Sequence, residues 1–74
     1  MPVIDVVAEI TGNVWKIVAE VGATLEEDEP IMILESMKME IPVSAPEDGT
    51  LLEVLVEPDT VVTQGQVLAR IEAA

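Results

Sequence analysis

Apolar and polar residues alternate over short stretches of this sequence, and glycine or proline interrupts these stretches every few positions. Such a pattern is typical of short strands joined by tight turns, and it argues against helices. β-Branched residues, which favour strands, are frequent among the apolar positions. The predicted strands cover residues 3–9, 13–20, 24–26, 30–36, 39–45, 50–57, 61–63 and 67–72.

The sequence also repeats itself at an offset of 37 residues without a gap. Ile4, Val6, Ala8, Gly12, Glu20 and Glu35 recur as Ile41, Val43, Ala45, Gly49, Glu57 and Glu72. Two equivalent halves of about four strands each predict an all-β fold in which each half covers the apolar face of the other. We expect a flattened β-barrel or sandwich of two four-stranded antiparallel sheets with pseudo-two-fold symmetry.

Alternation within two of the strands predicts which side chains form the core. The expected inward-facing sets are Trp15, Ile17 and Ala19 in residues 13–20, and Leu52, Val54 and Val56 in residues 50–57. Trp15 is the only aromatic residue, and its equivalence to Leu52 predicts a core or half-core position for the indole rather than a ligand-stacking role.

Residues 31–43 join the two halves, with two apolar runs on either side of a polar tip. This arrangement predicts a β-hairpin with Met37 and Lys38 as its two-residue loop. The expected pairs are Ser36 with Met39, Glu35 with Glu40, Leu34 with Ile41, and Met32 with Val43. This register is favoured over a one-residue slip because it gathers the apolar side chains on one face.

The predicted tip lacks the residues that stabilise tight hairpins. Two-residue loops favour positive φ and therefore Asn-Gly, whereas this sequence has Met37-Lys38. A residue with a Cβ in the left-handed region costs about 1 kcal/mol or more. Glu35 opposite Glu40 adds a like-charge pair. Because departures from local rules are expected at functional sites, the tip is the candidate site.

Fifteen acidic residues against Lys16, Lys38 and Arg70 give a net charge of -12. Nucleic acids and anionic membranes are therefore poor partners, because three cations cannot neutralise a run of phosphates. The acidic surface favours solubility, or steers the chain toward basic patches on partner enzymes. There is no cysteine, no secretion signal and no apolar run of membrane-spanning length, so we expect a cytoplasmic protein.

Catalysis by the chain itself is not expected, since it has no His, Cys or Tyr for acid–base or nucleophilic work. The acidic residues 26–29 lack the ordered ligand pattern of an EF-hand loop, so no metal site is predicted. Lys38 is suited instead to be acylated by another enzyme, because exposed lysine amines are almost entirely protonated at neutral pH and need an added base.

The segment Glu35-Ser36-Met37-Lys38-Met39-Glu40 resembles the attachment motif of the biotinyl/lipoyl-attachment domain family, commonly Glu-Ala-Met-Lys-Met. The resemblance extends over nearly the whole chain, as a single domain of residues 1–74. The sequence departs from the family pattern at Asp28 and Asp59, where glycine is common, and at Glu9, where proline is common. Since Asp tolerates positive φ, we expect the turns at Asp28 and Asp59 to form without glycine.

The resemblance implies a small single-domain biotin carboxyl carrier protein. A biotin-protein ligase would attach biotin covalently to Lys38, at a tip formed with Glu35, Ser36, Met37, Met39 and Glu40. Biotin carboxylase would then carboxylate the attached ring, and a carboxyltransferase would pass the carboxyl group to an acceptor that the sequence does not specify. The chain would make no bonds itself and would act as a tether that raises effective concentration.

Two alternatives stay open. The first is a lipoyl carrier of a 2-oxo-acid dehydrogenase-type complex, in which Lys38 would bear a lipoyl group. The methionines on both sides of Lys38 argue against it, because lipoyl tips typically resemble Asp-Lys-Ala. The second alternative is an unmodified acidic adaptor that binds other proteins by strand addition or by charge.

Overall fold

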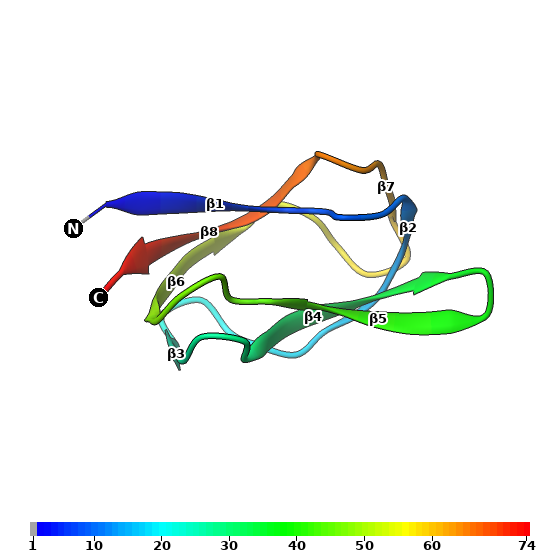
Figure 1. Ribbon diagram of the computed structural model, residues 1–74. Coiled ribbons are helices and arrows are strands. Elements are labelled where there is room, and N and C mark those ends of the chain that lie inside the picture. Colours follow the sequence, from blue (N-terminus) through cyan, green and yellow to red (C-terminus); the bar gives the residue numbers. More distant parts are fainter. Residues whose placement is uncertain (1) are drawn as a thin grey trace.

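The computed structural model describes residues 2–74, which form eight strands (Figure 1). The strands are β1 (Val3–Val7), β2 (Gly12–Ile17), β3 (Thr24–Leu25), β4 (Pro30–Ser36), β5 (Met39–Ser44), β6 (Gly49–Val54), β7 (Val61–Val62) and β8 (Val67–Ala73). Each lies within a few residues of its predicted range. No helix among residues 2–74 is long and apolar enough to span a membrane.

The strands form two four-stranded antiparallel sheets, with the orders β1-β8-β6-β3 and β5-β4-β2-β7. The repeat of 37 residues places β5, β4, β2 and β7 at the positions equivalent to β1, β8, β6 and β3. Even the irregularities repeat, since the register shift between Val14 and Lys16 recurs between Leu51 and Glu53. The predicted all-β fold and its pseudo-two-fold symmetry are confirmed.

The core consists of apolar side chains from both halves. The largest fully buried ones are Val14, Leu25, Ile31, Met32, Leu34, Leu51, Val62, Leu68 and Ile71. Most of them occupy equivalent positions in the two halves of the repeat, such as Leu34 and Ile71. Burying one such side chain contributes about 1.5–3 kcal/mol, so the two halves stabilise each other through this shared core.

The expectation that Trp15 and Leu52 point inward is wrong. Their side chains are 42% and 40% exposed, whereas the preceding Val14 and Leu51 are fully buried. The register shifts in β2 and β6 are β-bulges, and an extra residue in a strand reverses the alternation that follows it. Trp15 lies at the surface, where Lys16 Nζ is 4.6 Å from the centroid of its ring.

The rest of the predicted inward sets does contact the core. Val56 is buried, and the side chains of Ile17, Ala19 and Val54 are partly buried and pack against the core. The error is therefore confined to the bulge residue of each strand.

Arg70 on β8 links three neighbouring strands. Its Nε lies 3.0 Å from Asp5 Oδ1 on β1, and its Nη1 lies 2.5 Å from Glu53 Oε1 on β6. The hydrogen bond to Glu53, and to a smaller extent the one to Asp5, raises the pKa of the Arg70 guanidinium above its ordinary value. One of the three cations of the chain is thus committed to cross-strand pairing.

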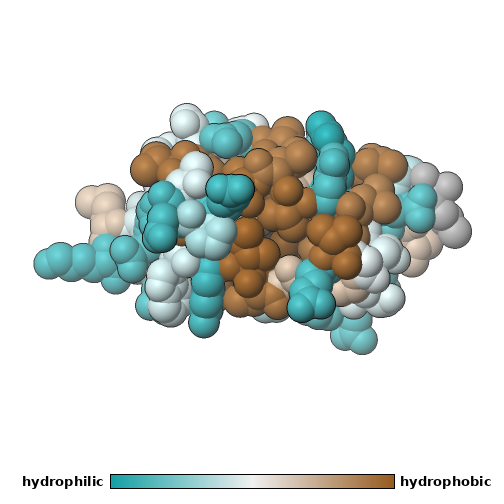
Figure 2. All heavy atoms as spheres, turned by 180° about the vertical axis from the view of Figure 1, so that it is seen from behind, coloured by the Kyte–Doolittle hydropathy of each residue, from teal (hydrophilic) through white to brown (hydrophobic). Residues whose placement is uncertain are grey.

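The molecule is elongated, with extents of 36 × 18 × 17 Å. The hairpin of β4 and β5 projects at one end, and both chain termini lie at the other (Figure 1). Seen from behind, hydrophobic side chains gather across the middle of the molecule, and hydrophilic ones project at the end where the hairpin lies (Figure 2). The fold therefore places the hairpin tip far from the termini.

Candidate functional site

The β4–β5 hairpin has the register that the sequence predicted. Met32 pairs with Val43, Leu34 with Ile41, Glu35 with Glu40, and Ser36 with Met39. Of these side chains, those of Met32, Leu34 and Val43 are buried in the core. The apolar part of the hairpin anchors it, so its polar end extends from a fixed base.

Met37 and Lys38 form the turn, with φ values of 49° and 69°. Positive φ at both central residues is the geometry of a type I′ turn, which matches the twist of the flanking strands. For residues with a long side chain this conformation costs about 1–2 kcal/mol each. The strained tip predicted from the sequence is present in the structure.

The side chains of the tip are presented to solvent. Met37 is 93% exposed and Met39 is 63% exposed, and Lys38 between them is exposed as well. Glu35 and Glu40 are exposed on the two strands below, while Ser36 is half-buried. The structure thus brings all six predicted site residues together, with one amine between two thioethers.

Within the residues that the structure describes, the amine of Lys38 has no acidic partner. Between residues 2 and 74 the salt bridges involve Arg70 only, and no side-chain hydrogen bond includes Lys38. Nor are three His, Cys, Asp or Glu side chains of this part of the chain placed to hold a metal ion. The tip therefore presents a primary amine to solvent, where another molecule can reach it.

Gly12 supports the base of the tip in a way that sequence reasoning missed. It lies just outside the predicted strand of residues 13–20, but it is the first residue of β2. A Cβ at this position would lie 2.8 Å from the carbonyl oxygen of Glu35 and 3.4 Å from Ser36 Cβ. Glycine therefore allows β2 to approach β4 directly below the turn. The recurrence of Gly12 as Gly49 was the sequence signal for this close packing. If two strands approach closely in each half of the repeat, each half needs a glycine at that position.

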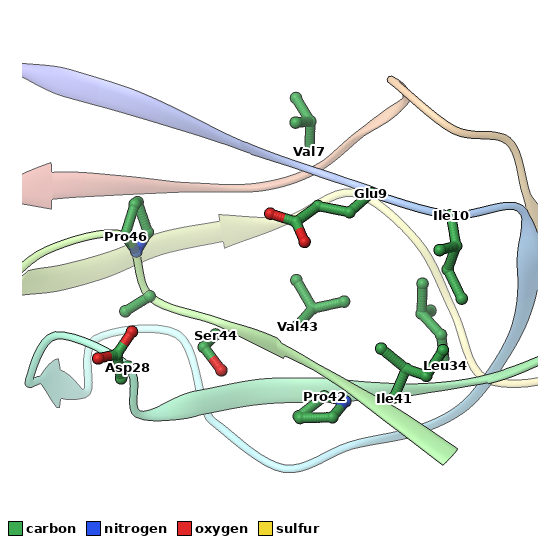
Figure 3. A pocket seen from close by; sticks show the side chains of 11 residues that line it. Val7, Glu9, Ile10, Asp28, Leu34, Ile41, Pro42, Val43, Ser44 and Pro46 are labelled. Carbon is green, nitrogen blue, oxygen red and sulfur yellow. The ribbon is translucent and has the colours of Figure 1, made fainter. Parts of the chain in front are cut away.

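A groove of about 320 Å³ lies beside the hairpin, lined partly by Val7, Glu9, Ile10, Ile41 and Val43. Figure 3 shows Glu9 and Val43 pointing into it from opposite walls. None of residues 35–40 lines this groove. The candidate site is therefore a projection from the surface, and the groove is a separate feature.

The family model described as "Biotin-requiring enzyme", the biotin/lipoyl family, matches residues 1–71. The chain belongs to the biotin/lipoyl family. This match confirms the resemblance drawn from residues 35–40 and its extent over nearly the whole chain. The relatives of this biotin/lipoyl domain include both short proteins and parts of long ones.

The chain is 42% identical over 67 residues to the biotin-dependent acyl-coenzyme A carboxylase alpha3 subunit of Mycobacterium leprae, covering 90% of this chain and 11% of that protein. It is 40% identical over 60 residues to the biotin/lipoyl attachment protein of Bacillus subtilis, covering 81% and 82%. Among solved structures, the Kluyveromyces lactis urea carboxylase superimposes with a TM-score of 0.92 and 32% identity, covering 97% of this chain and 6% of that one. The biotin/lipoyl domain thus spans a small part of the carboxylases and most of the attachment protein.

Proposed function

We propose that the chain is a biotin carboxyl carrier domain, residues 1–74, in which a biotin-protein ligase acylates Nζ of Lys38. The observation that carries this proposal is the geometry of the tip. An exposed amine without an ionic partner stands at the apex of a type I′ turn, between two exposed methionines. A turn with this strain has no advantage for stability, and recognition by a modifying enzyme accounts for its presence.

The residues fit a covalently attached biotin. Attachment through an amide needs a primary amine that a ligase can reach from outside, and the side chain of Lys38 meets this need. The exposed thioethers of Met37 and Met39 offer a ligase an adaptable apolar surface beside the amine. Glu35, Ser36 and Glu40 complete the surface at the end of the stem.

Once bound, biotin supplies a ureido ring to which a carboxyl group is added and from which it is removed. The chain holds the attachment point at the end of the β4–β5 hairpin. The buried residues of this hairpin prevent the tip from folding back onto the domain. Acylation removes the positive charge of Lys38, so that Glu35 and Glu40 then dominate the charge of the tip. A negative tip on a chain of net charge -12 is steered toward basic entrances of partner active sites.

The proposed partners besides the ligase are biotin carboxylase and a carboxyltransferase. The chain forms no bonds itself in this scheme. It raises the effective concentration of the carried group at each active site, as a tether does for any pair of sites that it can span. The M. leprae relative, a biotin-dependent acyl-coenzyme A carboxylase subunit, supports this setting.

A lipoyl carrier is the second candidate, because the B. subtilis relative is a biotin/lipoyl attachment protein. The two groups use the same amine and the same turn, so the scaffold does not discriminate between them. The methionines on both sides of Lys38 favour biotin.

The test is modification of the purified chain by a biotin-protein ligase with biotin and ATP, and in parallel by a lipoate-protein ligase with lipoate. We expect the intact mass to rise by one biotin in the wild type and in Lys16→Arg, the matched control with the other lysine removed. Lys38→Arg should remain unmodified and give no streptavidin signal. Lipoylation without biotinylation would favour the second candidate, and an unmodified wild type would contradict both.

A further inference from the structure

The methionines of the hairpin differ sharply in their exposure. Met32 lies in β4 and is fully buried, whereas Met37 is 93% exposed and Met39 is 63% exposed. The two exposed thioethers are the sequence neighbours of Lys38 on either side. The hairpin therefore presents two exposed methionine side chains at the candidate site and buries a third.

Exposed thioethers are oxidised by peroxides. The sulfur lone pair attacks one oxygen of hydrogen peroxide, an S–O bond forms, and the O–O bond breaks. The second oxygen leaves as hydroxide and takes the proton from the oxygen on sulfur to give water. The sulfur is oxidised by two electrons to a sulfoxide, and methionine sulfoxide reductases reverse the change.

We propose that Met37 and Met39 are a reversible peroxide-oxidation site that controls acylation of Lys38. This inference rests on the proposed function, since it concerns the step at which a ligase docks on the tip. Oxidation converts flexible apolar side chains into polar, chiral ones. A ligase that binds the apolar surface around Lys38 loses this surface on both sides of its target amine.

The fold itself should be insensitive to the same oxidation. The side chain of Met37 projects almost entirely into solvent, and Met39 pairs with Ser36 at the outer end of the stem. Neither belongs to the core, which on this hairpin contains Met32, Leu34 and Val43. Oxidation at the tip therefore changes recognition without removing core packing.

The experiment uses the full chain, treated with graded hydrogen peroxide and then freed of it before the ligase is added. Peptide mass spectrometry should find one added oxygen on Met37 and on Met39 at doses that leave Met32 unchanged. The initial rate of biotinylation should fall about tenfold, as expected for the loss of two thioether contacts. Treatment with the two stereospecific methionine sulfoxide reductases should restore the rate.

The matched control is Met37→Leu with Met39→Leu, which keeps apolar side chains of similar volume that peroxide does not oxidise. The biotinylation rate of this variant should be independent of peroxide. If the ligase accepts leucine poorly, recovery of the wild-type rate after reductase treatment gives the same information. Oxidation of Met32 as fast as the tip methionines would overturn the inference.

Equal biotinylation of the wild type before and after oxidation would overturn this inference alone. A wild type that is not biotinylated even before oxidation would instead overturn the proposed function. The proposed control by methionine oxidation would then fail as well.

Discussion

Among residues 2–74, four residues other than glycine have positive φ, and they fall into two kinds. Asp28 and Asp59, with φ of 70° and 66°, stand where the other half of the repeat has Gly65 and Gly22. This confirms that the turns form despite the absence of glycine, because Asp tolerates the left-handed region. Met37 and Lys38 have long side chains without this tolerance. Within the described part of the chain, residues poorly suited to positive φ therefore adopt it only at the tip.

Met37→Asn should raise the free energy of unfolding by about 0.5–1 kcal/mol, because Asn is a preferred first residue of a type I′ turn. Urea unfolding followed by far-UV circular dichroism measures this change. The matched control is Met39→Asn, where the new residue lies in β5 and gains no such advantage. Equal destabilisation by both substitutions would show that the turn at Met37 is not strained.

At the scale of the elements, the sequence predicts the hairpin better than it predicts β2. The hairpin register follows from alternation on both strands and from a loop of fixed length, and every expected pair is present. In β2, alternation alone suggested that Trp15 points inward, and nothing local marks the inserted residue of a bulge. The bulge depends on how β2 pairs with β4, and these strands are distant in the sequence, so the local sequence does not predict it.

The candidate site was predictable for the same reason as the hairpin. Residues 35–40 are contiguous, so the turn alone brings them together, and their placement needed no long-range contact. The packing of Gly12 against β4 is long-range and was not predicted from the sequence. The role of Lys38 remains a prediction, because geometry shows an accessible amine and not the group that it carries.

Gly12→Ala should lower the free energy of unfolding by about 1–3 kcal/mol, since the added Cβ would meet the carbonyl oxygen of Glu35 and force β2 and β4 apart. It should also slow biotinylation of the folded protein, because this contact lies at the base of the tip. Thermal unfolding and initial ligase rates measure the two effects.

Gly49→Ala is the control that the repeat provides, because its Cβ would meet the carbonyl oxygen of Glu72 on β8 in the same way. It should destabilise the fold while leaving the ligase rate of the folded protein unchanged. Equal slowing by both substitutions would mean that general loosening, and not displacement of the tip, controls the reaction.

At the scale of the molecule, charge opposes folding. Three cations face fifteen acidic residues, and Arg70 is paired with two of the carboxylates. The remaining carboxylates repel one another across a domain whose longest extent is 36 Å. This repulsion is expected to lower the free energy of unfolding.

Added salt should therefore stabilise the protein. Raising NaCl from about 10 mM to about 0.5 M shortens the Debye length from about 30 Å to a few ångströms and should raise Tm by about 4–8 °C. Differential scanning calorimetry measures the change. Arg70→Gln, which removes a cation and its two pairs, should show a larger increase. A fall in Tm with salt would mean that the Arg70 pairs outweigh the repulsion, contrary to the small value of exposed pairs.

We propose that the turn geometry selects Lys38 as the attachment point. Lys16 is also exposed, but it lies within β2 beside Trp15, so the chain contains its own comparison. Tandem mass spectrometry of the protein isolated from its native cell tests the claim most directly. We predict biotin in amide linkage on Lys38 and an unmodified Lys16. Biotin on Lys16, a lipoyl group on Lys38, or a bare Lys38 in cells whose other carrier proteins are biotinylated would contradict the account.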